Sequence, residues 1–233
     1  MINIQYFGGK TRTAKDIVQC INNYRNPNQD YIEPFVGGGI ILSKISDKRT
    51  AYDKHPYLIA MYKELQNGWI PPDTITKEEY YYIKNNKDEK PYLTGFVGFG
   101  CSFAGKWFGG YASNSRGDNY CLNSKNSILR KMNTLNDVHF EVADYKDLIF
   151  KDSLIYCDPP YQGTTQYGLV GEFDSIEFWE TMRKWSQDNT VIISEYHAPD
   201  DFKCVWERKT KTEIRNSDNI REDRVERLYT YVN

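Results

Sequence analysis

The sequence predicts a doubly wound α/β domain that is interrupted by an insertion. Apolar runs of strand length alternate with segments of helical periodicity up to about residue 67, and the alternation returns at Val138. Residues 68–135 contain Pro71-Pro72, a tyrosine run and a segment rich in glycine and aromatic residues, so we predict an inserted, mostly helical domain there. A length of 233 residues with 39% apolar residues suffices for one large core.

The elements before the insertion follow from residue spacing. Apolar side chains recur at helical spacing in 11–25 and 56–66, which predicts two amphipathic helices. An apolar run predicts a strand at 30–35, and a second strand ends at 51–52. Residues 39–46 follow a glycine turn and are predicted to form a short helix.

After the insertion, the chain returns to strands with one long helix between them. Apolar runs predict strands at 138–143, 153–157, 190–196, 203–208 and 227–232. The helix is expected at about 175–187. Its apolar residues are assigned to a buried stripe made of Ile176, Phe178, Trp179, Met182 and Trp185.

The segment Asp158-Pro159-Pro160-Tyr161 carries the most chemical information. Two consecutive prolines donate no backbone hydrogen bonds, so the strand at 153–157 stops there. Ligands of open α/β sheets bind at this edge. A carboxylate and a backbone carbonyl can accept both hydrogens of an exocyclic amine, while the tyrosine ring stacks on the base. The segment therefore predicts a nucleobase-amine site; the alternative is a structural turn that caps the strand.

A glycine turn, Glu-Pro-Phe-Val-Gly-Gly-Gly at 33–39, follows an earlier strand. Glycines permit positive φ and close approach of a ligand, and a helix beginning beyond them would offer free N–H groups. The turn matches neither the dinucleotide pattern nor a phosphate-binding loop, so its ligand need not carry phosphate.

Composition excludes several other classes. The five cysteines form no C-x-x-C pair, so neither a disulfide framework nor a zinc site is expected, and we predict no metal. There is no signal segment and no apolar run of about 20 residues, so a cytoplasmic protein without membrane contact is expected. The net charge of −2 means that any nucleic-acid surface must be local.

Together these segments resemble the Dam-like (D12 class) DNA adenine-N6 methyltransferases, in the family's order over essentially the whole chain. The resembling segments are 6–10, 33–39, 51–53, 140–145, 158–161, 191–196 and 226–233. The resemblance implies a Rossmann-like class I methyltransferase sheet built from 1–67 and 136–233. It also implies that 68–135 form a target-recognition domain, that S-adenosylmethionine is the cofactor and that double-stranded DNA is the substrate.

Cofactor roles follow from position and from the resemblance. Asp53, at the end of the second strand, can accept hydrogen bonds from both ribose hydroxyls, with a helix N-cap as the alternative. By the resemblance, Lys10 could contact the cofactor carboxylate. Asp144 could bond the adenine amine of the cofactor or lie in a surface loop. The candidate residues are Tyr6, Lys10, Phe35, Gly37, Asp53, Asp144 and Asp158.

Catalysis is assigned to Asp158, Pro159 and Tyr161. An adenine inside a duplex must be flipped out, at a cost of about a few kcal/mol, and stacking on Tyr161 would offset part of it. Asp158 and the Pro159 carbonyl would accept the two amine hydrogens, so that the nitrogen attacks the sulfonium methyl directly. No covalent intermediate is required.

The insertion carries the predicted DNA surface. Between Lys84 and Phe140 there are eight basic and four acidic residues, a local surplus that phosphate contacts require. Lys106, Asn114 and Arg116 are the candidate DNA-binding residues. Seven aromatic residues between 92 and 111 form a small core, and one or two could instead fill the hole left by an extruded base.

The sequence gives less information about the target sequence and the biological setting. The stretch 105–114 departs from the asparagine-rich hairpin of the family's GATC-specific members and looks more like phage-encoded ones. We expect a monomer or weak dimer in a bacterial cell or phage-infected host, in a restriction-modification or phage setting. The alternatives are a methyltransferase on cytosine N4 or protein glutamine, and a catalytically idle DNA-binding relative.

Overall fold

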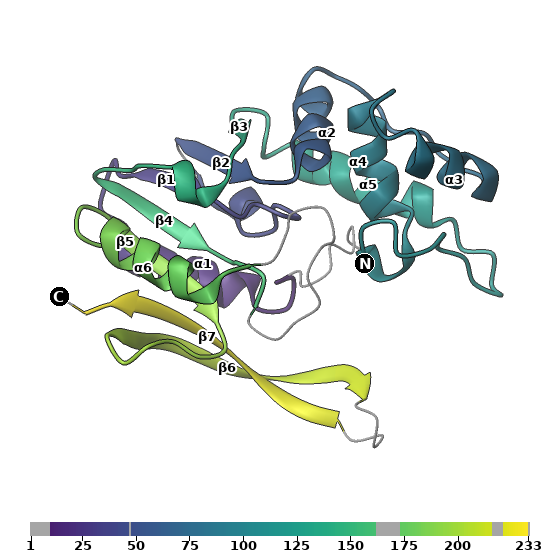
Figure 1. Ribbon diagram of the computed structural model, residues 1–233. Helices are drawn as coiled ribbons and strands as arrows, with labels where there is room; N and C mark the ends of the chain where they lie inside the picture. The colour runs from purple at the N-terminus through teal and green to yellow at the C-terminus, as the bar shows by residue number, and fades with distance from the viewer. Residues whose placement is uncertain (1–9, 47, 162–172, 216–220, 233) are drawn as a thin grey trace.

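One seven-stranded sheet forms the centre of the molecule, with the order β3-β2-β1-β4-β5-β7-β6 (Figure 1). The computed structural model describes residues 10–46, 48–161, 173–215 and 221–232. The strands are β1 (Asp30–Glu33), β2 (Arg49–Asp53), β3 (His139–Val142), β4 (Ser153–Cys157), β5 (Thr190–Glu195), β6 (Phe202–Arg215) and β7 (Arg221–Tyr231). The first five pair in parallel, and β7 runs antiparallel between β5 and β6.

Helices cover both faces of this sheet, which confirms the predicted doubly wound α/β fold. The helices are α1 (Ala14–Tyr24), α2 (Pro56–Gln66), α3 (Lys77–Asn85), α4 (Pro91–Gly100), α5 (Tyr120–Met132) and α6 (Ser175–Trp185), and the single 3₁₀ turns are η1 (Leu42–Lys44), η2 (Phe103–Gly105) and η3 (Tyr145–Asp147). Figure 1 shows α6 on the near face and α1 behind it.

The strand β4 shows how the sequence supports two covered faces. Its five residues are all buried. Leu154 and Tyr156 join the core that contains α1, while Ile155 and Cys157 join the core under α6. Successive side chains of a strand point to opposite faces, so a strand covered on both sides is apolar throughout.

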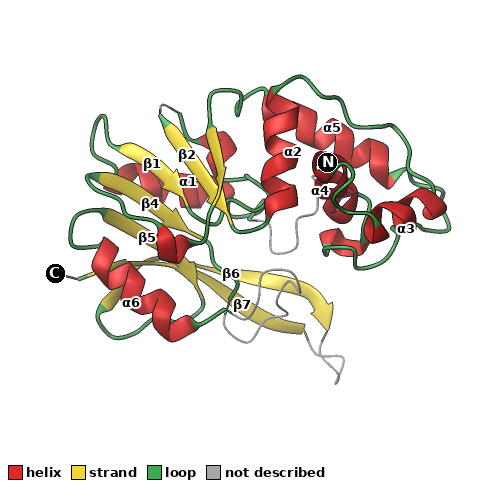
Figure 2. Cartoon of the chain, turned by 45° about the horizontal axis from the view of Figure 1, so that its top comes forward, coloured by secondary structure: helices red, strands yellow, loops and turns green. Residues whose placement is uncertain are grey.

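The insertion between α2 and β3 contains helices and one isolated β-bridge, between Ser102 and Tyr111. Its helices α3, α4 and α5 lie beyond the carboxyl ends of β1, β2 and β4 (Figures 1 and 2). Phe96 and Ile128 of the insertion belong to the same buried cluster as Tyr62 and Leu154, so its core is continuous with that of the sheet. The division into two domains at 68 and 135 stays a prediction.

The helix expected over 39–46 is wrong, because only the single turn η1 forms there. The Arg49 guanidinium donates to the carbonyls of Leu42 at 3.1 Å and Ile45 at 2.8 Å. These bonds satisfy carbonyls that a longer helix would use internally, and Ile45 is already extended, with ψ of 141°. The chain therefore turns directly into β2.

Two further expectations needed correction. Strands β6 and β7 are longer than predicted and pair as far as Arg215 and Arg221. The prediction was too short because this part of the sequence is rich in charged residues and shows no apolar alternation. Ile176 is 76% exposed and does not belong to the buried stripe of α6, whereas Phe178 and Met182 are buried. At about 100° per residue, Ile176 points well away from the face that those two share.

The contrast within α6 predicts a difference in stability. Phe178→Ala removes a ring that is 1% exposed and should lower the free energy of unfolding by about 3–5 kcal/mol. Ile176→Ala, on the same helix, should change it by less than about 0.5 kcal/mol. Urea unfolding followed by circular dichroism measures both, and equal losses in the two variants would contradict the assignment of the faces.

Candidate active site

Acidic side chains gather where the parallel strands end. Glu33 ends β1, Asp53 ends β2, and Asp158 directly follows β4. Because β1 pairs with both β2 and β4, these three side chains lie at one edge of the sheet. A cluster of carboxylates at one edge requires nearby cations or partial protonation.

Lys10 supplies a cation at Asp158. Its Nζ lies 3.2 Å from Asp158 Oδ1 and 2.9 Å from Glu226 Oε2. It also donates a hydrogen bond to the Tyr161 hydroxyl, so all three ammonium protons have acceptors. The Lys10 side chain is only 7% exposed and that of Asp158 is 24% exposed, so the ammonium is the more shielded member of the ion pair. The structure thus places Lys10 against Asp158, and its predicted contact with the cofactor carboxylate stays a prediction.

The charges in this cluster act on one another. Burial raises the pKa of Asp158, Lys10 lowers it, and Glu226 raises it. Burial would lower the pKa of Lys10, but the two carboxylates outweigh this and raise it above its ordinary value. Lys10 therefore stays an ammonium at neutral pH and stabilises the ionised form of Asp158.

Tyr161 is fixed at both ends. Its hydroxyl donates to Glu226 Oε2 at 3.1 Å, and its ring meets Tyr196 edge to face, with 4.6 Å between the ring centres. The ring also lies 4.2 Å from the Lys10 ammonium. Pro159 is buried. The stacking role of Tyr161 and the acceptor role of the Pro159 carbonyl stay predictions.

Asp53 shapes the glycine turn. Its Oδ2 accepts from the backbone N–H of Gly37 at 3.0 Å and its Oδ1 from that of His55 at 2.9 Å. Gly37 and Gly39 have positive φ, of 46° and 61°. The cap of α2 is His55, not Asp53, so the N-cap alternative does not apply. Burial raises the pKa of Asp53 to about 6, and each carboxylate oxygen keeps a lone pair for a ligand.

An aromatic wall stands beside the glycine turn. The ring centre of Phe35 lies 5.1 Å from that of Tyr145 and 5.9 Å from that of Phe178. The buried Tyr145 hydroxyl has no hydrogen-bond partner among the described residues. The neighbouring Asp144 pairs with Lys54 at 2.8 Å instead of lying free in a loop.

These groups fit an adenosyl ligand. Asp53 offers acceptors for ribose hydroxyls, Phe35 offers an apolar ring, and Tyr145 offers a buried hydroxyl that needs a partner. Tyr6 lies outside the described residues. Within the described ranges, no group of three or more potential ligands could hold a metal ion, and no helix is long and apolar enough to cross a membrane.

The predicted DNA residues lie together in one part of the insertion. Lys106 and Arg116 are exposed. The Asn114 side chain accepts from the backbone N–H of Arg116 at 3.0 Å and of Asp118 at 3.2 Å, and its amide donates to Asp118. Asn114 thus builds the turn that carries Arg116; base reading by Asn114 stays a prediction.

Most of the aromatic residues in the insertion pack into its core, but Phe103 does not. It is 67% exposed, whereas Phe96, Phe99 and Phe108 are buried. The backbone around it is held by bonds from Phe103 N to Gly110 O at 2.8 Å and from Ala112 N to Cys101 O at 2.9 Å. A loop with backbone hydrogen bonds on both sides therefore presents the Phe103 ring to the outside.

The sheet order with its antiparallel β7 is typical of Rossmann-like class I methyltransferases. Residues 6–97 match the family of D12 class N6 adenine-specific DNA methyltransferases. The match covers Lys10, the glycine turn and Asp53, spans less than half of the chain, and ends before Asp158.

Comparison with solved structures gives distant likenesses only. A putative RNA methyltransferase from Pyrococcus horikoshii is 8% identical, with a TM-score of 0.45 over 99% of this chain and 89% of that one. An rRNA methyltransferase from Streptomyces viridochromogenes is 11% identical, with a TM-score of 0.45 over 99% of this chain and 90% of that one. No curated protein matches the sequence.

Sequence reasoning found neither Glu226 nor the contact of Lys131 with the glycine turn. Glu226 lies in a strand of alternating charges, where nothing marks it as a partner of Lys10. Lys131 donates a hydrogen bond to the carbonyl of Gly38 from the end of α5. A signal for Lys131 existed, because it follows Ser124 and Ile128 at helical spacing on the buried face of that helix.

Glu33 predicts a pH-dependent stability. It is 3% exposed and accepts from the Tyr31 hydroxyl at 2.7 Å, and burial raises its pKa to about 8. The folded state therefore holds a proton that the unfolded state releases near pH 4.5, so this contribution to stability is lost as pH rises toward 8.

Glu33→Gln keeps the acceptor oxygen and should remove this loss, which is on the order of a few kcal/mol at about 1.4 kcal/mol per pKa unit. Urea unfolding between pH 5 and pH 8 measures the slope. An identical slope in the wild type and the variant would mean that Glu33 ionises normally.

Proposed function

We propose that this protein is an S-adenosylmethionine-dependent DNA methyltransferase that acts on the N6 amine of a flipped-out adenine. The observation that carries the proposal is the placement of Asp158 at the end of β4, paired with Lys10 and beside the glycine turn and Asp53. The match of residues 6–97 to the D12 family supports adenine in DNA as the substrate.

The residues divide the work as follows. Asp53, Phe35 and Gly37 would hold the cofactor, which supplies a methyl group on sulfonium sulfur. Asp158 and the Pro159 carbonyl accept the two hydrogens of the adenine amine, so that its lone pair points at that methyl group. Much of the acceleration comes from holding the amine in line with the methyl group.

Lys10 sets the state of Asp158 during this reaction. The Lys10 ammonium lies 3.2 Å from Asp158 Oδ1, and we assign Oδ2 to the amine. After transfer, the nitrogen carries an extra proton, which Asp158 accepts directly or through water. Glu226 favours this proton transfer, because it shares the Lys10 ammonium with Asp158 and raises the pKa of Asp158.

On the DNA side, the insertion supports the proposal. Its exposed Lys106 and Arg116 provide positive charge for phosphates or base edges. Phe103, on its braced loop, provides a ring that fills the hole left by the flipped adenine. The helices of the insertion, α3, α4 and α5, lie beyond the ends of the strands (Figure 2).

Replacement of Asp158 separates chemistry from binding. Asp158→Ala should reduce methyl transfer by more than about 10³-fold, because the amine loses its acceptor, while cofactor affinity survives at least in part. Asp53→Ala, in contrast, should weaken cofactor binding about tenfold or more. Calorimetry with S-adenosylmethionine gives the affinities.

Mass spectrometry of nucleosides from DNA, after incubation with labelled cofactor, gives the product. Labelled N6-methyladenine is the expected result. Labelled N4-methylcytosine, label in protein glutamine, or no label at all would each replace the proposal by one of its alternatives. Transfer by Asp158→Ala within tenfold of wild type would remove Asp158 from the mechanism.

Variants in the insertion test the DNA surface. The double replacement of Lys106 and Arg116 by Ala should weaken DNA binding and reduce its salt dependence, since fewer counterions are released. Phe103→Ala should leave the salt slope unchanged but reduce base flipping, read as fluorescence of 2-aminopurine at the target position.

Cofactor affinity serves as the control for both variants and should not change. If DNA affinity and salt slope stay at wild-type values in the double variant, the interface lies elsewhere, and the first region to test is the basic stretch from Arg208 to Arg227.

A further inference from the structure

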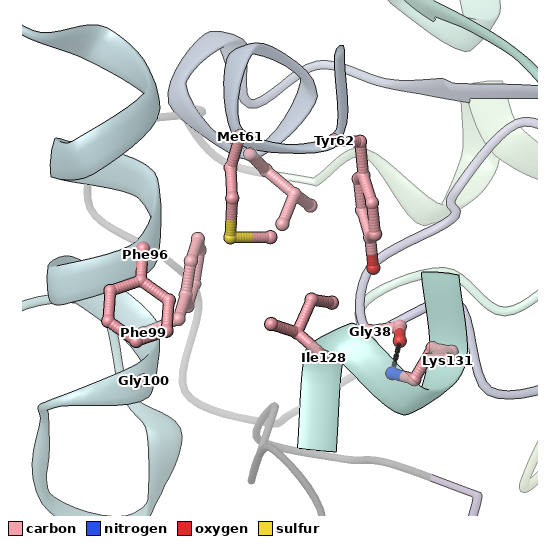
Figure 3. A pocket seen from close by; sticks show the side chains of 9 residues that line it. Gly38, Met61, Tyr62, Phe96, Phe99, Gly100, Ile128 and Lys131 are labelled. Carbon is pink, nitrogen blue, oxygen red and sulfur yellow. Dashed lines mark hydrogen bonds between the residues drawn. The ribbon is translucent and has the colours of Figure 1, made fainter. Parts of the chain in front are cut away.

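The carbonyls of the glycine turn are held from the side of α2 and α5. The Tyr62 hydroxyl donates to Gly37 O at 3.0 Å, and the Lys131 ammonium donates to Gly38 O. Figure 3 shows Tyr62 and Lys131 beside one small cavity, with the Lys131 bond to Gly38 as a dashed line. With Asp53 on the N–H of Gly37, the turn is held at three polar groups of Gly37 and Gly38.

Lys131 is half-buried, with its ammonium beside a mostly apolar cavity. The cavity at its ammonium is lined mostly by apolar side chains, among them Met61, Phe96 and Ile128. Among the described residues, Gly38 O is the one hydrogen-bond acceptor of its three protons. Burial lowers the pKa of Lys131 to about 8, and the nearby Glu33 offsets only part of this.

A poorly compensated ammonium costs stability, and an apolar side chain of similar length would fill this cavity better. Natural proteins keep such costs mainly where function needs the group. The only described acceptor of Lys131 belongs to the turn that the proposed function assigns to the cofactor, and α5 belongs to the insertion that it assigns to DNA.

We propose that Lys131 is a positioning residue through which the insertion holds the cofactor turn, so that cofactor binding and DNA binding favour each other. This inference rests on the proposed function. A bond from α5 fixes the Gly38 carbonyl only when the insertion is correctly seated, and a turn fixed by cofactor holds α5 in return. Such coupling is reciprocal by thermodynamic necessity.

Lys131→Met tests the proposal because it keeps the length of the side chain and removes the donor and the charge. Its melting temperature without ligand should be equal to or above that of wild type, while S-adenosylmethionine affinity by calorimetry should fall about five- to tenfold, the effect of one hydrogen bond. Arg130→Met, on the exposed side of the same helix, should change neither quantity.

Coupling is measured as the ratio of the DNA affinities with and without S-adenosylhomocysteine. The loss of a phosphate contact would lower both affinities equally and would leave this ratio unchanged. The ratio should fall toward one in Lys131→Met. Tyr62→Phe, which loosens Gly37 from outside the insertion, should weaken cofactor binding but keep the wild-type ratio.

The possible failures are distinguishable. If the wild type does not bind S-adenosylmethionine, the proposed function itself fails. If the wild type binds and Lys131→Met matches it in affinity and ratio, this inference alone is overturned. The inference is also overturned if Lys131→Met lowers the melting temperature together with cofactor affinity, because Lys131 would then have a merely structural role. The same holds if Tyr62→Phe lowers the ratio of DNA affinities as much as Lys131→Met does.

Discussion

The ion pair between Lys10 and Asp158 is the interaction on which the site depends. Parallel strands end at one edge of a sheet, so the fold brings Glu33, Asp53 and Asp158 together whether or not their charges are compatible. A buried cluster of ionised carboxylates would be strongly unfavourable. Lys10 relieves this at Asp158, and it is held there by Glu226 from a strand at the other end of the chain. The site thus closes only when β7 has joined the sheet.

The other constraint is the conformation of the glycine turn. Positive φ at Gly37 and Gly39 costs little in itself, but the turn would be loose without the bonds that hold it. Those bonds come from β2, α2 and α5, that is, from three elements that pack together only in the folded core. The insertion is therefore part of the frame of the site and not an appendage to it.

Much of this could be predicted from the sequence, and the rest could not for definite reasons. The sheet and the edge at Asp158 follow from apolar runs and from two prolines, which are local signals. The partner of Lys10 could not be found, because Glu226 lies 216 residues away along the chain. The length of β6 and β7 could not be predicted, because their outer parts are rich in charged residues and lack an apolar alternation. These parts are strands because they pair with each other. Ile176 was misplaced because an apolar residue near a helix start can face solvent while a polar residue caps the turn.

The two neighbouring carboxylates, Glu33 and Asp158, have different surroundings. Glu33 is buried and has no directly bonded cation among the described residues, so with its pKa at about 8 it is mostly protonated at neutral pH. Burial also raises the pKa of Asp158, but Lys10 bonds this carboxylate directly and favours its charged form. A neutral Glu33 spares Asp158 a second negative charge across β1 and β4, which would otherwise raise its pKa further. Environments that push two pKa values apart are how a fold assigns separate roles to like groups, and here they leave Asp158 as the carboxylate that can accept hydrogens from an amine.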